Sequence, residues 1–312
     1  MIIQNQKNDI GVERRTVTIG IPAYNEEANI KNLLYAILNQ KQDDFDLLQI
    51  IVVSDGSSDN TVKEAESVSS EKISIINRLE RKGKTESQNE ILTLFRGDIL
   101  VLLDADVIPK DEMFLSNLIK PFSIDSRIGL VGGKVSPLPS ENFFEKVLNF
   151  SVAMKEEIVG SVNLGDNLYL CHGCNTAFSK DFAKRLKWPK IYGEDGYSYL
   201  MCKEKGFEFH YEPKAEVLYR SPQMFKDHLK QSVRFAHSDN ILKNFFPKSV
   251  IKKGYSIPKI IIFKKGIKYF FKNPFLFVSY FFIYVSARAF SKIGNRTSAL
   301  WEISKSSKSL IK

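Results

Sequence analysis

The stretch TVTIGIPAYNEEANIKNLLYAILNQ, residues 16–40, decides the fold class of this chain. Its first seven residues are mostly β-branched or apolar and end at Pro22, which is typical of a buried strand. In the remainder, apolar residues recur at the spacing of one helical face: Ile30, Leu33, Leu34, Ile37 and Leu38. A strand followed directly by an amphipathic helix is the repeating unit of an α/β fold.

Further strand-like runs follow along the chain. Residues 48–54 (LQIIVVS) predict a second strand, and a helix over 62–68 follows the capping oxygens of Asp59, Asn60 and Thr61. Residues 73–76 and 99–103 predict two more strands. This alternation predicts a Rossmann-like, mostly parallel sheet with helices on both faces. Because ligands bind outside the carboxyl ends of such strands, PAYNEE, SDGSSDNT and DAD predict one shared site.

The composition is globular, but the charge is unevenly distributed. The 312 residues are 43% hydrophobic and 26% charged, which suits one large or two modest domains. Residues 248–312 carry 14 Lys and Arg against one acid, Glu302, whereas residues 1–247 are mildly acidic. Three cysteines are too few, and odd in number, for a disulfide framework, which favours a reducing compartment. The first 15 residues lack the apolar run of a secretory signal.

The basic C-terminal segment predicts contact with a membrane surface on the cytoplasmic side. Residues 257–271 (IPKIIIFKKGIKYFF) interleave lysines with bulky apolar residues, as in amphipathic helices at a headgroup boundary. Residues 275–287 are apolar but shorter than the roughly 20 residues that span a bilayer. We therefore expect an interfacial anchor, with a pair of buried core helices as the alternative. Basic residues spaced among aliphatic ones argue against a nucleic-acid partner.

Two acidic motifs carry the sharpest chemical signal. Asp104 and Asp106 follow an apolar run, and two carboxylates at this spacing can hold Mg²⁺ or Mn²⁺ together with a substrate diphosphate. The alternative is a pair of turn acids that cap a helix over 111–119. Asp55 also follows a strand and suits a base N–H or a ribose hydroxyl, unless it belongs to an ordinary strand-to-helix turn.

Cys171, His172 and Cys174 form a second cluster of possible ligands, with Cys202 as a further thiol. A structural zinc site usually needs a second pair of ligands at suitable spacing, and the sequence has none. We therefore do not expect a zinc or redox site in this segment.

Seven motifs in one order resemble a known family. IPAYNEE, VVSDGSSDNT, GKTESQN, LLDAD, GCNTAFSKD, GED and QSVRF are similar to motifs of the family 2 inverting glycosyltransferases, which have the GT-A fold. The resemblance covers residues 17–235. QSVRF resembles the Q-x-x-R-W signature of polysaccharide synthases, with phenylalanine in place of tryptophan.

The resemblance implies a role for each matching position. One group would line the nucleotide-sugar pocket: Pro22, Ala23, Tyr24, Asn25, Glu26, Asp55, Lys84, Asp104, Ala105, Asp106, Gln231 and Arg234. Asp106 and Asp104 would also hold the Mg²⁺ or Mn²⁺ cofactor. Another group would meet the acceptor: Gly173, Asn175 and Phe235.

The acid pair Glu194 and Asp195 would carry the catalysis. Asp195 would be the general base, and low polarity together with the charge of Glu194 would raise its pKa. The alternative is an acid pair that is favourable at a helix N-terminus. Arg234, a permanent charge, would pair with the diphosphate.

These inferences predict an inverting glycosyltransferase. It would move a sugar from a nucleotide-sugar, expected to be UDP-linked, to a lipid-linked or polysaccharide acceptor at a membrane. A polyprenyl-phosphate glycosyl synthase is the alternative, followed by a nucleotidyltransferase or an inactive membrane scaffold. Residues 1–247 would form the GT-A domain, with a donor half over 16–110 and an acceptor half over 111–247. Residues 248–312 would form the membrane-interface tail.

Overall fold

The computed structural model describes residues 14–291 and 309–310, and an eight-stranded sheet lies at its centre. The strand order is β3-β2-β1-β4-β7-β6-β8-β5. The strands are β1 (Arg15–Ala23), β2 (Phe45–Asp55), β3 (Ile73–Arg78), β4 (Ile99–Leu103), β5 (Val107–Pro109), β6 (Ile128–Pro137), β7 (Asn175–Ser179) and β8 (Glu208–Tyr219). Strands β7 and β5 run against the other six, so the predicted mostly parallel α/β sheet is confirmed.

The four strands expected from the sequence are β1 to β4, and their carboxyl ends lie at one edge of the sheet. Ala23 pairs with Ser54, and Asp55 pairs with Arg78, so β1, β2 and β3 end in line. Strand β4 runs parallel to β1 and is buried throughout, because helices cover both faces of the sheet. The polar segments after β1, β2 and β4 therefore meet at this edge.

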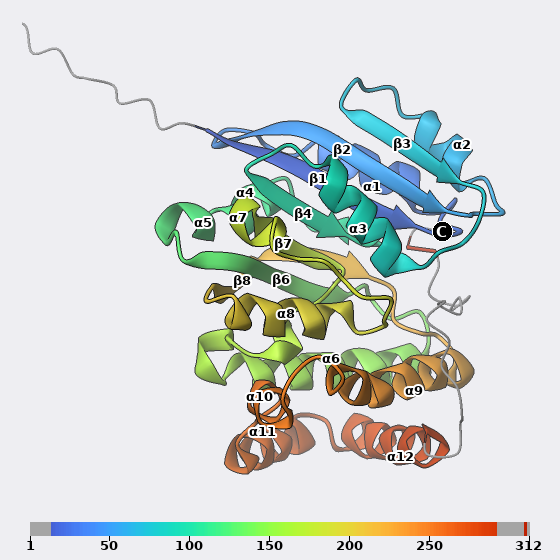
Figure 1. Cartoon of the computed structure of the whole chain (residues 1–312). Coiled ribbons are helices and arrows are strands. Elements are labelled where there is room, and N and C mark those ends of the chain that lie inside the picture. Colours follow the sequence, from blue (N-terminus) through green and yellow to red (C-terminus); the bar gives the residue numbers. More distant parts are fainter. Residues whose placement is uncertain (1–13, 292–308, 311–312) are drawn as a thin grey trace, which may run out of the picture.

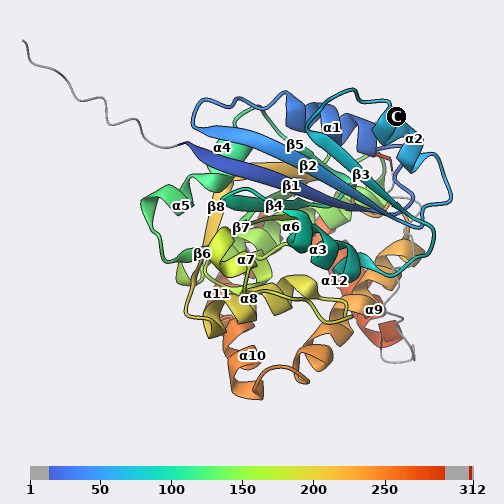
Figure 2. The ribbon, with the colours of Figure 1, turned by 45° about the horizontal axis from the view of Figure 1, so that its top comes forward.

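Two layers of helices cover the sheet (Figures 1 and 2). The helices around the first half are α1 (Ile30–Leu38), α2 (Thr61–Glu66), α3 (Lys84–Leu94), α4 (Phe114–Ile119), α5 (Pro121–Ile124), α7 (Lys180–Ala183) and α8 (Glu194–Glu204). Side chains of β2 alternate between two core clusters: Ile50 packs with α1, α2, α4 and α5, and Ile51 packs with α3, α7 and α8. Each face of the sheet thus has its own core.

The helix expected from the apolar spacing of Ile30 to Leu38 is α1. The residues before it do not continue this helix, because Asn25 has a φ of 54° and residues 24–29 form a turn. The helix predicted over 62–68 is α2, and Asp59 Oδ1 accepts a hydrogen bond of 3.0 Å from the Thr61 N–H at its start. The early turn leaves the residues after β1 free to form a binding loop.

The remaining helices form a layer below the sheet in Figure 1. They are α6 (Phe143–Gly160), α9 (Phe225–Leu242), α10 (Lys248–Gly254), α11 (Lys259–Lys272) and α12 (Pro274–Ser291). Two single 3₁₀ turns, Asn163–Gly165 and Leu168–Leu170, follow α6. The α11–α12 hairpin packs against α6 through Tyr269, Leu276 and Tyr280.

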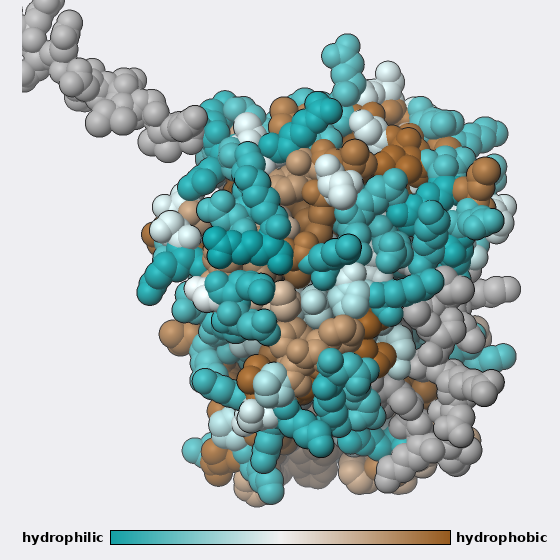
Figure 3. Space-filling view, in the orientation of Figure 1, coloured by the Kyte–Doolittle hydropathy of each residue, from teal (hydrophilic) through white to brown (hydrophobic). Residues whose placement is uncertain are grey.

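The outer face of the α11–α12 hairpin is exposed and strongly apolar. Phe263, Phe271, Phe275 and Phe282 are each 65–76% exposed. Brown, hydrophobic side chains are visible at this lower end of the molecule in Figure 3. The sequence left two alternatives for this segment, an interfacial anchor and a pair of buried core helices. The inner face of the hairpin is docked on α6, and its outer face is exposed, so a membrane contact stays a prediction. No helix within residues 14–291 combines the length and the apolarity needed to cross a bilayer.

Candidate active site

Lys84 brings together two acidic segments that are far apart in the sequence. It is the first residue of α3, and its Nζ lies 2.5 Å from Asp104 Oδ1 and 2.8 Å from Glu194 Oε1. Asp104 directly follows β4, and Glu194 is the first residue of α8. All three side chains are mostly buried, with 7–17% of their surface exposed. The D-x-D segment and the start of α8 therefore meet around Lys84, at the candidate site here called the cleft.

Asp195 lies on the same side of the cleft, against the loop that precedes β7. A Cβ atom added to Gly173 would stand 3.0 Å from Glu194 Oε1 and 3.4 Å from the Cβ of Asp195. In the same loop, the carbonyl of Cys174 accepts a hydrogen bond of 3.3 Å from the Asp104 N–H. The loop thus connects the acids of β4 with those of α8, and a side chain at position 173 would require the Glu194 carboxylate to shift by a few tenths of an ångström.

The electrostatics of the cleft are those of clustered acids around one ammonium group. Burial raises the pKa of Asp104 to about 7, aided by Asp106 and opposed by Lys84. Burial lowers the pKa of Lys84, but the charges of Asp104 and Glu194 outweigh it and hold that pKa above the usual lysine range. Lys84 is therefore charged whenever its acidic partners are ionised.

The same acids affect the pKa of the Cys174 thiol. Burial raises its pKa, and Asp104, Asp106 and Asp195 raise it further through their negative charge. Cys171 and Cys202 are buried free thiols. Among the residues that the structure describes, no three His, Cys, Asp or Glu side chains are grouped closely enough to hold a metal ion by themselves.

Glu194 has a partner that the sequence did not indicate. Its carboxylate is paired with Lys84, and its expected effect on the pKa of Asp195 stays a prediction. The two acids are the first two residues of α8, as the helix-terminus alternative requires. Glu194 thus anchors the start of α8 to α3 and β4, and Asp195 follows it at the rim of the cleft.

Asp55 organises the loop that leads into α3. Its two carboxylate oxygens accept hydrogen bonds of 2.8 Å from the backbone N–H groups of Lys82 and Gly83, and Arg78 donates to it at 3.1 Å. Gly83 has a φ of 104°, a conformation that favours glycine. In this arrangement Asp55 supports the loop that carries Lys84, and its contact with a base or ribose stays a prediction.

The loops after β1 and β2 are tied together by hydrogen bonds. The side-chain oxygen of Asn25 accepts from the Ser58 N–H at 2.8 Å, and the Glu26 N–H donates to the Thr61 hydroxyl at 2.7 Å. The guanidinium of Arg81 lies 3.7 Å from the centre of the Tyr24 ring. These contacts give the predicted nucleotide loop a fixed shape.

Several predicted site residues are buried or belong to a strand. Ala23 and Ala105 are 2% exposed and pack in the core, and Pro22 is the penultimate residue of β1. Their contacts with a nucleotide-sugar stay predictions. Asn175 is fully buried, and its amide nitrogen donates at 3.0 Å to the carbonyls of Lys134 and Ala215. A contact between this amide nitrogen and an acceptor would break both bonds, so the arrangement supports a structural place for Asn175.

The QSVRF motif, residues 231–235, lies within α9. Gln231 is half-buried on this helix. The side chains of Arg234 and Phe235 fall outside the described part of the structure, so their predicted contacts with the diphosphate and the acceptor stay predictions.

Arg220 and Leu310 link distant parts of the chain, and no sequence motif pointed to them. Arg220 directly follows β8, whose last residue, Tyr219, pairs with Val107. Arg220 bonds to the buried Glu145 at 3.1 Å and donates to the carbonyl of Leu310 at 3.4 Å. The Leu310 N–H in turn donates to Asn29 Oδ1 at 3.1 Å. The short described segment near the C label in Figure 1 therefore joins the β1 loop to the end of β8.

Comparison with known proteins gives a family match over more than half of the chain. The family described as "Glycosyl transferase family 2" matches residues 18–187. A poly-beta-1,6-N-acetyl-D-glucosamine synthase of Staphylococcus aureus is 25% identical over 256 residues, which are 78% of this chain and 60% of that protein. The probable glycosyltransferase YdaM of Bacillus subtilis is 27% identical over 84% of this chain and 63% of its own length. The chain thus spans about 60% of the length of these relatives.

Solved structures share the fold. A mannosyltransferase of Pyrobaculum calidifontis, in complex with GDP-Man and Mn²⁺, aligns over 92% of this chain and 78% of its own, with a TM-score of 0.59 and 19% identity. A glucosyl-3-phosphoglycerate synthase of Mycobacterium tuberculosis, in complex with Mn²⁺, UDP and phosphoglyceric acid, aligns over 75% of this chain and 80% of its own, with a TM-score of 0.54 and 20% identity. Both similarities concern the fold.

Proposed function

Because this chain belongs to glycosyl transferase family 2, we propose that it moves a sugar from a nucleotide-sugar to an acceptor hydroxyl, with inversion at the anomeric carbon. One observation supports this proposal most directly. Lys84 contacts both Asp104 and Glu194, so the acids after β4 and those at the start of α8 share one cleft. Sugar transfer needs a charged group at the leaving diphosphate and a base at the attacking hydroxyl, and the cleft offers both.

In the proposed donor complex, the loops after β1 and β2 hold the nucleoside, and Asp104 and Asp106 face the diphosphate. Two carboxylates fit Mg²⁺ or Mn²⁺, which commonly bind through one or two carboxylates and the substrate phosphates. When bound, the cation would offset the charge that develops on the departing diphosphate. Two solved relatives, crystallised with Mn²⁺ and either GDP-Man or UDP, support this choice, and we favour a UDP-linked donor.

Asp195 is the proposed general base. Its carboxylate takes the proton of the acceptor hydroxyl while that oxygen forms a bond to the anomeric carbon. The bond from this carbon to the diphosphate oxygen breaks at the same time, and the nucleoside diphosphate leaves on the opposite face. The glycine at position 173 lets the loop before β7 pack closely against Glu194 and Asp195. Glu194, held by Lys84, keeps the start of α8 in place.

The proposed acceptor is a saccharide or a lipid-linked sugar at the cytoplasmic face of a membrane. The relative named as a poly-beta-1,6-N-acetyl-D-glucosamine synthase supports a growing saccharide. The exposed aromatic face of the α11–α12 hairpin, next to lysines such as Lys264 and Lys272, suits a surface of anionic headgroups. We propose that this face rests on the membrane and keeps the cleft near its acceptor.

The substitution Asp195→Asn tests the proposal. Donor binding should stay within about twofold, because the amide keeps the shape of the side chain, whereas turnover should fall at least about 100-fold as the base is lost. Binding is measured as the rise in melting temperature with UDP-, GDP- and TDP-sugars and Mn²⁺, and turnover as nucleoside diphosphate released with water as the acceptor.

The control variant is Glu204→Gln, at the far end of the same helix. It should match the wild type in both measurements. Near-normal turnover by Asp195→Asn would show that another group is the base. A protein that responds to none of the donors would overturn the proposed function.

A further inference from the structure

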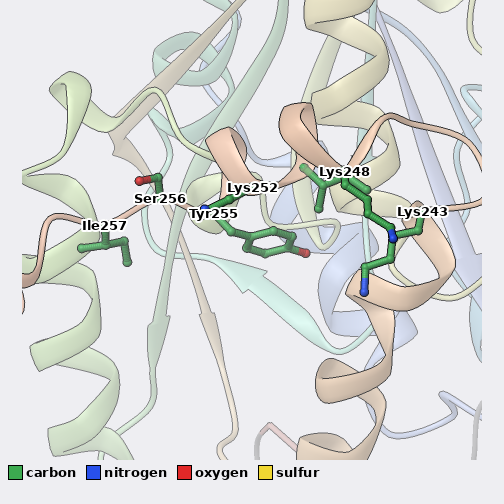
Figure 4. Close-up of a pocket in the computed structure, with 7 residues that line it drawn as sticks. Lys243, Lys248, Lys252, Tyr255, Ser256 and Ile257 are labelled. Carbon is green, nitrogen blue, oxygen red and sulfur yellow. The ribbon is translucent and has the colours of Figure 1, made fainter.

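An open hollow on the helical layer has a basic lining. It has a volume of about 420 Å³, and three lysines border it: Lys243 at the end of α9, and Lys248 and Lys252 on α10. Figure 4 shows the ring of Tyr255 extending toward Lys243 and Lys248. No acid lines the hollow, and residues 241–291 contain neither Asp nor Glu. Three ammonium groups around one space favour an anionic ligand.

The hollow lies directly behind the helix that carries the proposed base. A Cβ atom added to Gly196 would stand 3.7 Å from the hydroxyl of Tyr255, and Gly196 follows Asp195 on α8. Gly254 approaches α8 as well, since a Cβ there would lie 3.6 Å from a methyl group of Leu200. Tyr255 thus contacts both the hollow and the helix that carries the proposed base.

Two isoleucines complete the lining of the hollow, which leads to the exposed face of α11. Ile251 is buried in the core cluster that α8 shares with the sheet, whereas Ile257 packs against the cluster of α6, α11 and α12. Beyond Ile257, α11 presents Ile260 and Phe263, which are 57% and 65% exposed. The hollow thus lies where the core cluster of α8 meets the α11–α12 hairpin. Lysines line it, and the exposed apolar side chains of α11 lie beside it.

We propose that this hollow binds the phosphate group of a lipid-linked acceptor, with the lipid chain lying along α11. The inference rests on the proposed function, because it gives the acceptor of the transferase a chemical class. The ligand needs both parts. A phosphate satisfies Lys243, Lys248 and Lys252, and an apolar chain covers the exposed side chains that begin at Ile260. The linked sugar would then extend past Tyr255 toward the cleft.

Binding of farnesyl phosphate, a soluble amphiphile with one phosphate, tests the proposal by titration calorimetry. The full chain should bind it at least about tenfold more tightly than farnesol, which lacks the phosphate, and than inorganic phosphate, which lacks the chain. The variant Lys243→Gln/Lys248→Gln/Lys252→Gln should bind it at least about tenfold more weakly than the wild type.

A matched variant removes the same charge elsewhere. Lys63→Gln/Lys120→Gln/Lys214→Gln alters three exposed lysines outside α9–α12 and should keep wild-type affinity within about twofold. Equal affinities of the two triple variants would overturn the proposal. Farnesol binding as tightly as farnesyl phosphate would overturn the phosphate site, and inorganic phosphate binding as tightly would overturn the lipid chain.

Two further measurements separate the possible causes. If the wild type binds phosphatidylglycerol vesicles but not farnesyl phosphate, and both triple variants lose vesicle binding equally, the lysines contribute only diffuse charge and the proposal fails. Donor-induced thermal stabilisation, measured on the same samples, reports the proposed function separately. Normal donor binding by Lys243→Gln/Lys248→Gln/Lys252→Gln also shows that this variant is folded. Its loss of affinity for farnesyl phosphate is then assigned to the hollow.

Discussion

Lys84 illustrates what single residues contribute to this cleft. The sequence placed it near the donor because of the motif around it, and the structure adds that it bonds to Asp104 and Glu194. No pattern in the sequence predicts an ion pair between residues so far apart. The position of Asp104 and Asp106 after a buried strand was predictable, because an apolar run that ends in two acids has few other readings.

We expect Lys84→Met to destabilise the protein by about 3 kcal/mol at pH 7, because it leaves two mostly buried carboxylates without their cation. Urea unfolding measures the change. The double variant Lys84→Met/Glu194→Gln should regain part of the lost stability, because the unpaired Glu194 carboxylate is replaced by a neutral amide. If the double variant is less stable than Lys84→Met, the ion pairs do not explain the role of Lys84.

At the scale of elements, the pattern of apolar residues located strands β1 to β4 and most of the helices around them. The turn before α1 was not predicted, because it depends on the left-handed conformation of Asn25, which hydrogen bonds to Ser57 and Ser58 help to hold. Such bonds join two loops, and periodicity within one segment carries no information about them. The same holds for the place of α11 and α12, whose apolar faces are visible in the sequence but whose partner, α6, is not.

Glu157 fastens α11 to α6 and gives this contact a pH dependence. Its carboxylate lies 2.8 Å from Lys265 Nζ and 2.6 Å from Lys268 Nζ. The hydrogen bonds from Lys265 and Lys268 lower the pKa of Glu157 from 4.5 to about 2. A carboxyl group whose folded pKa is depressed stabilises the fold fully above its unfolded pKa, and loses this effect as the pH falls through the folded value.

Glu157→Gln should therefore lower the free energy of unfolding by about 1 kcal/mol at pH 7, a modest value because the pair is partly exposed. The difference from wild type should shrink between about pH 4.5 and pH 2. Urea unfolding at several pH values measures it, with Glu66→Gln on the surface of α2 as a control that should show almost no difference. A difference that grows toward low pH would contradict the assignment.

At the scale of the whole molecule, the exposed aromatic face of α11 and α12 is the feature with the clearest consequence. Replacing Phe263, Phe271 and Phe282 by serine should weaken binding to phosphatidylglycerol vesicles roughly 100-fold. Each ring that becomes partly buried in the membrane contributes about 1 kcal/mol to binding. Co-sedimentation at low salt measures this. The matched control replaces Leu79, Ile124 and Leu164, apolar residues that are 74–99% exposed elsewhere, and should bind as the wild type does. Equal binding by both variants would contradict a membrane role for the hairpin.

The sequence predicted the sheet and the gathering of acids at its edge, but not how the C-terminal part of the chain completes the molecule. The predicted boundary at residue 247 separates α9 from α10, yet Ile251 of α10 packs in the same core cluster as Leu200 of α8. Leu310 even reaches Asn29, near the first loop of the site. Contacts between residues so far apart in the sequence depend on the packing of the whole chain, and no local sequence pattern indicates them.

The clustering of acids around Lys84 also has a consequence for the nucleotide. Lys84 pairs with Asp104 and Glu194, and Asp104, Asp106 and Asp195 all lie close enough to raise the pKa of the Cys174 thiol. Carboxylates repel a bare nucleoside diphosphate, and a divalent cation that accompanies the nucleotide offsets this repulsion. We therefore expect the affinity of this region for a nucleotide to depend on which counter-ion travels with it.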